Sequence, residues 1–246
     1  MNFDSVASSI KKNRVLNKII YFQSLDSTNK YLMENDSESG TIAAAVIQTA
    51  GRGRQGAGWV SGKGGLWFSF VINKKIINPY MFVVLSSVAV VETLVKYGLK
   101  PVIKWPNDIL VQSSKICGIL IENDAFNARI VTGIGVNVNN EAPHGLNQPV
   151  ISVKKAANRK INEEEFFIRL VKKLDSYLYN IKGLKKKLIS KWVRNQADIT
   201  GREVSVIRNK KRISGEVQKV HKDGSVSIAD KQGRIHKIKG EVFFMM

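Results

Sequence analysis

Positions 51–59 read Gly-Arg-Gly-Arg-Gln-Gly-Ala-Gly-Trp, and this segment restricts the fold more than any other part of the chain. Its four glycines oppose a helix or a regular strand, because glycine loses the most backbone freedom on ordering. Apolar stretches at 41–49 and 66–72, both typical of buried strands, flank the segment. It therefore predicts a loop that joins two strands.

The same loop carries groups that suit a ligand. Arg52 and Arg54 present planar donor forks that match carboxylates and phosphates, and Trp59 can stack on a flat ring. Glycine also lets a backbone approach a ligand closely. We interpret the segment as a clamp over an anionic, nucleotide-like ligand, and a plain surface loop is the alternative.

Two common phosphate-binding loops are excluded. Residues 51–56 match the pattern G-x-G-x-x-G, but residues 57–65 cannot form the helix that a dinucleotide-binding fold needs next. Gly64 follows Lys63 where a Walker A loop has Ser or Thr. A zinc site is not indicated either, because the single cysteine, Cys117, has no partner at zinc-ligand spacing.

Three further segments each allow two interpretations. Asn107 and Asp108, after a proline, can hold Mg²⁺ near phosphates or simply form a turn. Lys115 precedes an apolar strand, where it neutralises a bound anion or is an exposed strand-end lysine. The glycines in 133–137 mark either close approach of a ligand or a β-bulge.

The remaining pattern predicts a mixed α+β chain. Ser27 and Asn162 are expected to cap two helices, and Gly98 to end a third at 79–97. Further elements are expected as strands at 102–104, 109–111, 116–122 and 129–138 and a helix at 184–194. Beyond residue 198, short alternating strands predict a small β-barrel of about 50 residues. We therefore expect two domains, 1–195 and 196–246.

Composition indicates the cellular compartment and the class of partner. The net charge of +19 favours an acidic partner or nucleic acid, but the basic residues are spread over the whole chain rather than clustered. The longest apolar runs are too short to span a membrane. A single cysteine fits the reducing cytoplasm. We expect a cytoplasmic protein with no membrane partner.

Five motifs follow one another in a fixed order: 27–29, Gln48 with 51–59, 104–108, 115–120 and 133–139. Together they resemble the biotin–protein ligases, or biotin–[acetyl-CoA-carboxylase] ligases, over about residues 20–140. The resemblance implies a mixed β-sheet flanked by helices, as in class II aminoacyl-tRNA synthetases and biotin synthetases, and a small C-terminal SH3-like β-barrel. Only about 18 residues precede 19–22, so we expect the monofunctional type without an N-terminal DNA-binding domain.

The resemblance also implies an ATP-dependent ligase that works in two steps. Biotin's carboxylate attacks the α-phosphate of ATP, with Mg²⁺ on the nucleotide, to give biotinyl-5′-AMP and pyrophosphate. The ε-amine of a lysine on a biotin carboxyl carrier protein then takes the biotinyl group. Dimers are frequent in the family, which favours a homodimer.

The family's roles carry over onto matching residues. The catalytic roles fall on Lys115, Arg52 and Arg54. The residues implied to bind biotin are Ser27, Thr28, Asn29, Gln48, Gly51, Arg52, Gly53, Arg54, Lys115 and Gly118. Those implied to bind ATP are Arg54, Trp59, Lys104, Asn107, Asp108 and Asn137. Asp108 is also the expected Mg²⁺ ligand.

Two other functions stay open at this point. A lipoate–protein ligase has a similar catalytic fold, although the loop at 51–59 and the turn at 104–108 favour biotin. A basic nucleic-acid-binding protein is the second, but its barrel would lack the interleaved aromatic residues of a stacking platform. Residues 240–246 contain no arginine, whereas some ligases reach the nucleotide with one near that end.

Overall fold

The computed structural model describes residues 1–73, 78–124, 127–141, 148–208 and 211–238. Its helices are α1 (Phe3–Ile10), α2 (Thr28–Glu34), α3 (Tyr80–Val95), α4 (Val153–Ala156), α5 (Glu163–Tyr179) and α6 (Ile181–Arg194). Its first seven strands are β1 (Lys18–Leu25), β2 (Thr41–Gln48), β3 (Leu66–Asn73), β4 (Val102–Lys104), β5 (Asp108–Val111), β6 (Ser114–Asp124) and β7 (Arg129–Val136). Four more follow: β8 (Glu203–Arg208), β9 (Lys211–Val220), β10 (Val226–Ala229) and β11 (Ile235–Ile238).

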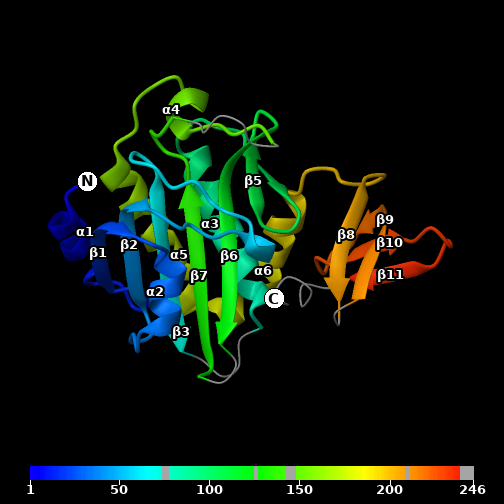
Figure 1. Cartoon of the computed structure of the whole chain (residues 1–246), viewed down its shortest axis with the longest axis horizontal. Coiled ribbons are helices and arrows are strands. Elements are labelled where there is room, and N and C mark those ends of the chain that lie inside the picture. Colours follow the sequence, from blue (N-terminus) through cyan, green and yellow to red (C-terminus); the bar gives the residue numbers. More distant parts are fainter. Residues whose placement is uncertain (74–77, 125–126, 142–147, 209–210, 239–246) are drawn as a thin grey trace.

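A seven-stranded mixed sheet in the order β1-β2-β3-β7-β6-β5-β4 organises most of the chain. Only β1 and β2 pair in parallel, and the other neighbours are antiparallel. Helices α3, α5 and α6 cover one face of the sheet, and α2 lies on the other (Figure 1). The mixed sheet with flanking helices confirms the predicted fold class.

Alternation along the central strands divides the two faces of the sheet, because successive strand side chains point to opposite sides. Phe68 and Phe70 of β3 pack on the large helical core, whereas Val71 packs beneath α2 with Leu32. Helix α3 is apolar all round and almost wholly buried, as expected for a helix between other elements. The face that carries α2 has a smaller apolar cluster and also bears polar side chains, among them Ser69 of β3.

The helix caps agree with the sequence. The Ser27 side chain caps α2, and the Asn162 side-chain oxygen accepts a hydrogen bond from Glu165 N at 3.1 Å at the start of α5. Gly98 has a φ of +82° just after α3, the left-handed conformation that glycine adopts most easily. Helix α1 and strand β1 were not predicted, because both mix polar with apolar residues.

The chain after residue 198 forms a second, four-stranded antiparallel sheet in the order β11-β10-β9-β8. It has its own small core of Ile199, Val206, Val217, Val226, Ile228 and Ile238. Trp105 packs against both this core and the main one. The sheet is consistent with the expected small barrel, while the boundary at 195/196 stays a prediction and residues 240–246 lie outside the described ranges.

Glu92 on α3 is bonded to side chains of α5 and α6, and the free energy of unfolding should therefore depend on pH. Tyr177 Oη donates to its carboxylate at 2.6 Å, and Lys173 and Lys191 form ion pairs with it. Burial raises the pKa of Glu92, but the hydrogen bonds from Lys191, Tyr177 and Lys173 outweigh burial and lower the pKa to about 2.

We expect Glu92→Gln to lower the free energy of unfolding by about 1–3 kcal/mol at neutral pH, because hydrogen bonds to the charged group are lost. Since the folded pKa lies below the ordinary 4.5, the difference from wild type is full above about pH 4.5 and shrinks as the pH falls toward 2. Urea unfolding between pH 3 and 7 measures it, and a difference that stays constant with pH would count against the assignment.

Within the described ranges, no helix combines the length and hydropathy that a membrane span requires.

Candidate functional site

A pocket of about 600 Å³ opens on the face of the main sheet that carries α2. Its walls come from the start of α2, the loop at 51–59, the turn after β4, and strands β6 and β7. Every residue predicted for the site lines it except Gly51. Five motifs spread over more than a hundred positions of sequence therefore meet in one cavity.

Gly51 serves the loop rather than the pocket. A Cβ at this position would lie 2.3 Å from the carbonyl oxygen of Trp59. The loop closes on itself there, because Trp59 N donates to Gly51 O at 2.8 Å and Gly53 N donates to Ala57 O at 2.6 Å. The glycines thus permit a tight, hydrogen-bonded loop that brings both arginines to the pocket.

The polar floor of the pocket is built on the N-terminus of α2. Thr28 N and Thr28 Oγ1 both donate to Gln48 Oε1, at 2.9 and 3.0 Å. Gln48 Nε2 donates in turn to Ser61 Oγ at 2.8 Å. Ser27 and Thr28 are almost fully buried here. These groups give the floor both donors and acceptors, which suits the polar head of a small ligand.

Asn29 supports this floor from below. Its Nδ2 donates to Glu122 Oε2 at 2.8 Å, and its Oδ1 accepts a hydrogen bond from Ser69. A Cβ on Gly133 would lie only 2.1 Å from Asn29 Oδ1. The glycine of β7 is therefore required by the packing of Asn29, and the alternative of a β-bulge at 133–137 is wrong, because β7 pairs in unbroken register through Gly133.

Gly133→Ala should lower the free energy of unfolding by about 1–3 kcal/mol, because the new methyl group overpacks a rigid, buried contact. Gly62→Ala is the matched control, since a Cβ there meets nothing within 4 Å and its φ is not positive. Chemical denaturation of both variants measures the effect. Equal stability of the two variants would show that Asn29 is not held as described.

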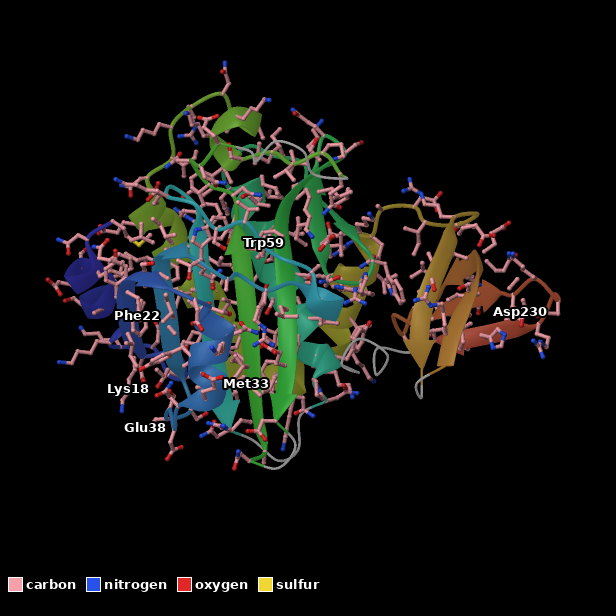
Figure 2. All side chains as sticks on the ribbon, in the orientation of Figure 1. Lys18, Phe22, Met33, Glu38, Trp59 and Asp230 are labelled. Atoms are coloured by element: carbon pink, nitrogen blue, oxygen red, sulfur yellow. The ribbon has the colours of Figure 1, made fainter. Side chains whose placement is uncertain are left out.

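Lys115 and Arg54 supply positive charge to the pocket, and we call this part of it the cationic wall. Lys115 Nζ lies 2.9 Å from Asp108 Oδ1 and 4.9 Å from the centre of a Trp59 ring. Trp59 lies over β6 and β7, where a Cβ on Gly118 or Gly135 would come within 3 Å of its ring (Figure 2). The lysine is thus oriented between a carboxylate and an aromatic face, not exposed at a strand end.

Arg54 bridges the loop to the turn after β4. Its Nη1 donates to Asn107 Oδ1 at 3.0 Å, and Asn107 Nδ2 donates to Ile119 O at 2.7 Å. Burial lowers the pKa of Arg54, and Asp108 opposes that shift. A guanidinium nevertheless stays charged near neutral pH. Arg54 therefore places a fixed positive charge at the pocket.

The two other residues predicted to bind the nucleotide also line the pocket. Asn137 is buried and its Oδ1 accepts from Asn140 Nδ2 at 2.8 Å, whereas Lys104 is exposed. Across the described residues, no group of three His, Cys, Asp or Glu side chains converges to hold a metal. Burial raises the pKa of the Cys117 thiol, so it stays protonated and is no nucleophile.

Sequence reasoning missed Ser61, Ser69 and Glu122, which hydrogen-bond to residues of the pocket, and also missed lining residues such as Phe68, Gln148 and Val150. Glu122 forms an ion pair with Arg52 and is only 4% exposed. A signal was present, because Glu122 stands four residues after Gly118 on one strand and so shares its face.

The comparisons agree with the five motifs. The model of the biotin/lipoate A/B protein ligase family matches residues 20–139. The bifunctional ligase/repressor BirA of Bacillus subtilis is 38% identical over 157 residues, which cover 58% of this chain and 48% of that protein. BirA of Escherichia coli is 31% identical over 217 residues, covering 82% of this chain and 66% of that one. The chain thus spans about half to two thirds of the length of these curated relatives.

A solved structure covers nearly the whole chain. The biotin protein ligase from Aquifex aeolicus in complex with biotin and ATP aligns with a TM-score of 0.78 and 29% identity, over 91% of this chain and 97% of that one. The family model, the curated relatives and this solved structure all point to biotin or lipoate ligases. The region that the family model matches includes most of the residues that line the pocket. Residues 20–139, which include most of the main sheet and of the pocket, thus belong to the biotin/lipoate A/B protein ligase family.

Proposed function

We propose that this protein is an ATP-dependent biotin–protein ligase that makes biotinyl-5′-AMP and transfers the biotinyl group to a lysine of a biotin carboxyl carrier protein. One observation carries the proposal: a single pocket joins a hydrogen-bonding floor at Thr28 and Gln48 to a cationic wall that contains Lys115. Biotin has a neutral polar ring at one end and the reacting carboxylate at the other. A pocket that binds it therefore needs hydrogen-bonding groups for the ring and positive charge near the carboxylate.

The first step joins two anions. A carboxylate oxygen of biotin attacks the α-phosphorus of ATP, and the bond to the β-phosphate oxygen breaks to release pyrophosphate. Negative charge grows on the phosphate oxygens during the attack. Lys115, Arg52 and Arg54 line the pocket, and we assign to them the stabilisation of this charge, because fixed cations lower such barriers.

The second step needs no covalent enzyme intermediate. The acceptor's ε-amine attacks the acyl carbon of biotinyl-5′-AMP, AMP leaves, and the amine loses a proton as the amide forms. The glycine-rich loop restricts access of water to this reactive acyl phosphate. Mg²⁺ would rest mainly on the nucleotide phosphates, and Asp108, which pairs with Lys115, would supply a carboxylate ligand.

The floor favours biotin over lipoate, which the family also includes. Biotin's ureido ring has two N–H donors and a carbonyl acceptor, whereas the dithiolane ring of lipoate has no comparable groups. Thr28 and Gln48 already hydrogen-bond to each other, and their oxygens have further lone pairs that can accept from the ureido N–H groups. A dithiolane ring has no donor for these oxygens, so the floor suits biotin better.

Exchange of labelled pyrophosphate into ATP tests this choice, because it follows the reversible first step alone. We expect exchange that depends on biotin and is weak with lipoate or with no acid. Exchange that depends on lipoate alone would show that the protein activates lipoate instead of biotin. Tight, salt-sensitive binding of RNA or DNA without any exchange would show that the protein binds nucleic acid and is not this ligase. The homodimer and the cytoplasmic location stay predictions.

A further inference from the structure

Side-chain hydrogen bonds form a continuous path beneath the pocket. At one end Arg52 pairs with Glu122, whose other oxygen accepts from Asn29. Asn29 accepts from Ser69, and Ser69 Oγ lies 2.7 Å from Thr28 Oγ1. The path therefore leads from the first arginine of the loop to the floor of the pocket.

The same path continues back to the loop. Thr28 donates to Gln48, Gln48 donates to Ser61, and Ser61 Oγ donates to the carbonyl oxygen of Trp59 at 3.1 Å. Both ends of the loop at 51–59 are thus tied to one network. Its buried members are Ser61 and residues of α2, β3 and β6, so the main sheet and α2 fix the loop at two points.

Glu122 is the charged anchor of this network. Its side chain is 4% exposed, whereas that of Arg52 is 38% exposed. A carboxylate buried to this degree needs a cation or strong donors, because desolvation of an unpaired charge is costly. Arg52 satisfies this need, and the pairing in turn selects one orientation of a long side chain that is otherwise free to move in solvent.

We propose that Glu122 is a positioning residue: it holds Arg52 over the pocket so that the loop retains the acyl-adenylate. The inference rests on the proposed function and extends it to a residue outside the five motifs. Glu122 does not touch the reacting atoms. It acts through Arg52, and its carboxylate is oriented by the same Asn29 that supports the biotin floor.

The test measures how fast purified protein releases biotinyl-5′-AMP when no acceptor is present. We expect Glu122→Gln to speed release about tenfold, within the usual range of coupling between contacting residues. Arg52→Ala should speed release at least as much. The double variant should be no faster than Arg52→Ala alone, because Glu122 has nothing left to position.

A second readout does not depend on activity. Trypsin cleavage after Arg52 or Arg54 in the ligand-free protein reports how well the loop is held, and Glu122→Gln should raise its rate about tenfold. Glu92→Gln is the matched control, since it also removes a paired glutamate but lies on α3, away from the pocket. It should leave loop cleavage and adenylate release at wild-type rates.

The outcomes separate this inference from the proposed function. If wild type makes no biotinyl-5′-AMP, the proposed function fails, and trypsin cleavage still tests the anchor. If wild type makes it but Glu122→Gln releases it at the wild-type rate or more slowly, Glu122 does not position Arg52 for retention. Additive effects of Glu122→Gln and Arg52→Ala would also overturn the inference, because they indicate a purely structural role.

Discussion

Lys115→Ala is expected to slow formation of biotinyl-5′-AMP by about 10²–10³-fold, the usual cost of removing one preorganised group that stabilises charge in a transition state. Lys115 lines the pocket, with a side chain 13% exposed and an ion pair of 2.9 Å to Asp108. Its loss leaves the attacked phosphate without that charge. The pocket itself should persist, because Asp108 retains contact with solvent.

Biotin-dependent pyrophosphate exchange measures this effect, and a thermal melt checks that the variant is folded. Lys154→Ala is the control, since Lys154 is an exposed lysine that pairs with Glu141 and does not line the pocket. It should exchange at the wild-type rate. If Lys115→Ala exchanges pyrophosphate within twofold of the wild-type rate, Lys115 does not stabilise the transition state of adenylation.

Arg54→Gly should act on a different step, by letting biotinyl-5′-AMP escape. Arg54 ties the loop to Asn107 at 3.0 Å and places a half-buried charge at the pocket. Loss of one hydrogen bond to a charged group corresponds to about 10–150-fold faster release. Formation of the adenylate should fall less than it does in Lys115→Ala.

Release of labelled biotinyl-5′-AMP into a chase of unlabelled biotin and ATP measures retention. Arg169→Ala serves as a control, because it breaks an exposed ion pair with Glu165 on α5. If Arg54→Gly keeps the intermediate as long as wild type does, the loop does not act as an anion clamp. The contrast between slow formation in one variant and fast escape in the other separates chemistry from containment.

Much of the fold follows from local signals. Ser27 and Asn162 cap helices because their side-chain oxygens replace missing backbone partners, and both positions are evident from the residues alone. The first 25 residues gave weaker signals. Their α1 docks on α5 through Ser5 and Glu164, and Asp175 accepts hydrogen bonds from the backbone that follows α1. Such long-range contacts have no local pattern.

The residues of the site also fall into those that the sequence predicted and those that it did not. Residues within motifs, such as Gln48 and Lys115, were predicted and lie at the pocket. Ser69 was missed because it belongs to an apolar strand and reaches the site through the pairing of β3 with its neighbours, whereas the position of Glu122 on the face of Gly118 was a signal in the sequence. The roles of all these residues, the Mg²⁺ at Asp108 and the two-domain boundary remain predictions.

The most direct test of the central claim is the intact mass of a purified biotin carboxyl carrier domain after incubation with this protein, biotin and Mg²⁺-ATP. The proposal predicts the addition of one biotinyl group to a single lysine of the carrier, with none when ATP is left out or that lysine is replaced by arginine. A carrier whose mass is unchanged by the active, folded protein, or that gains only a lipoyl group when lipoate is supplied instead, would contradict it.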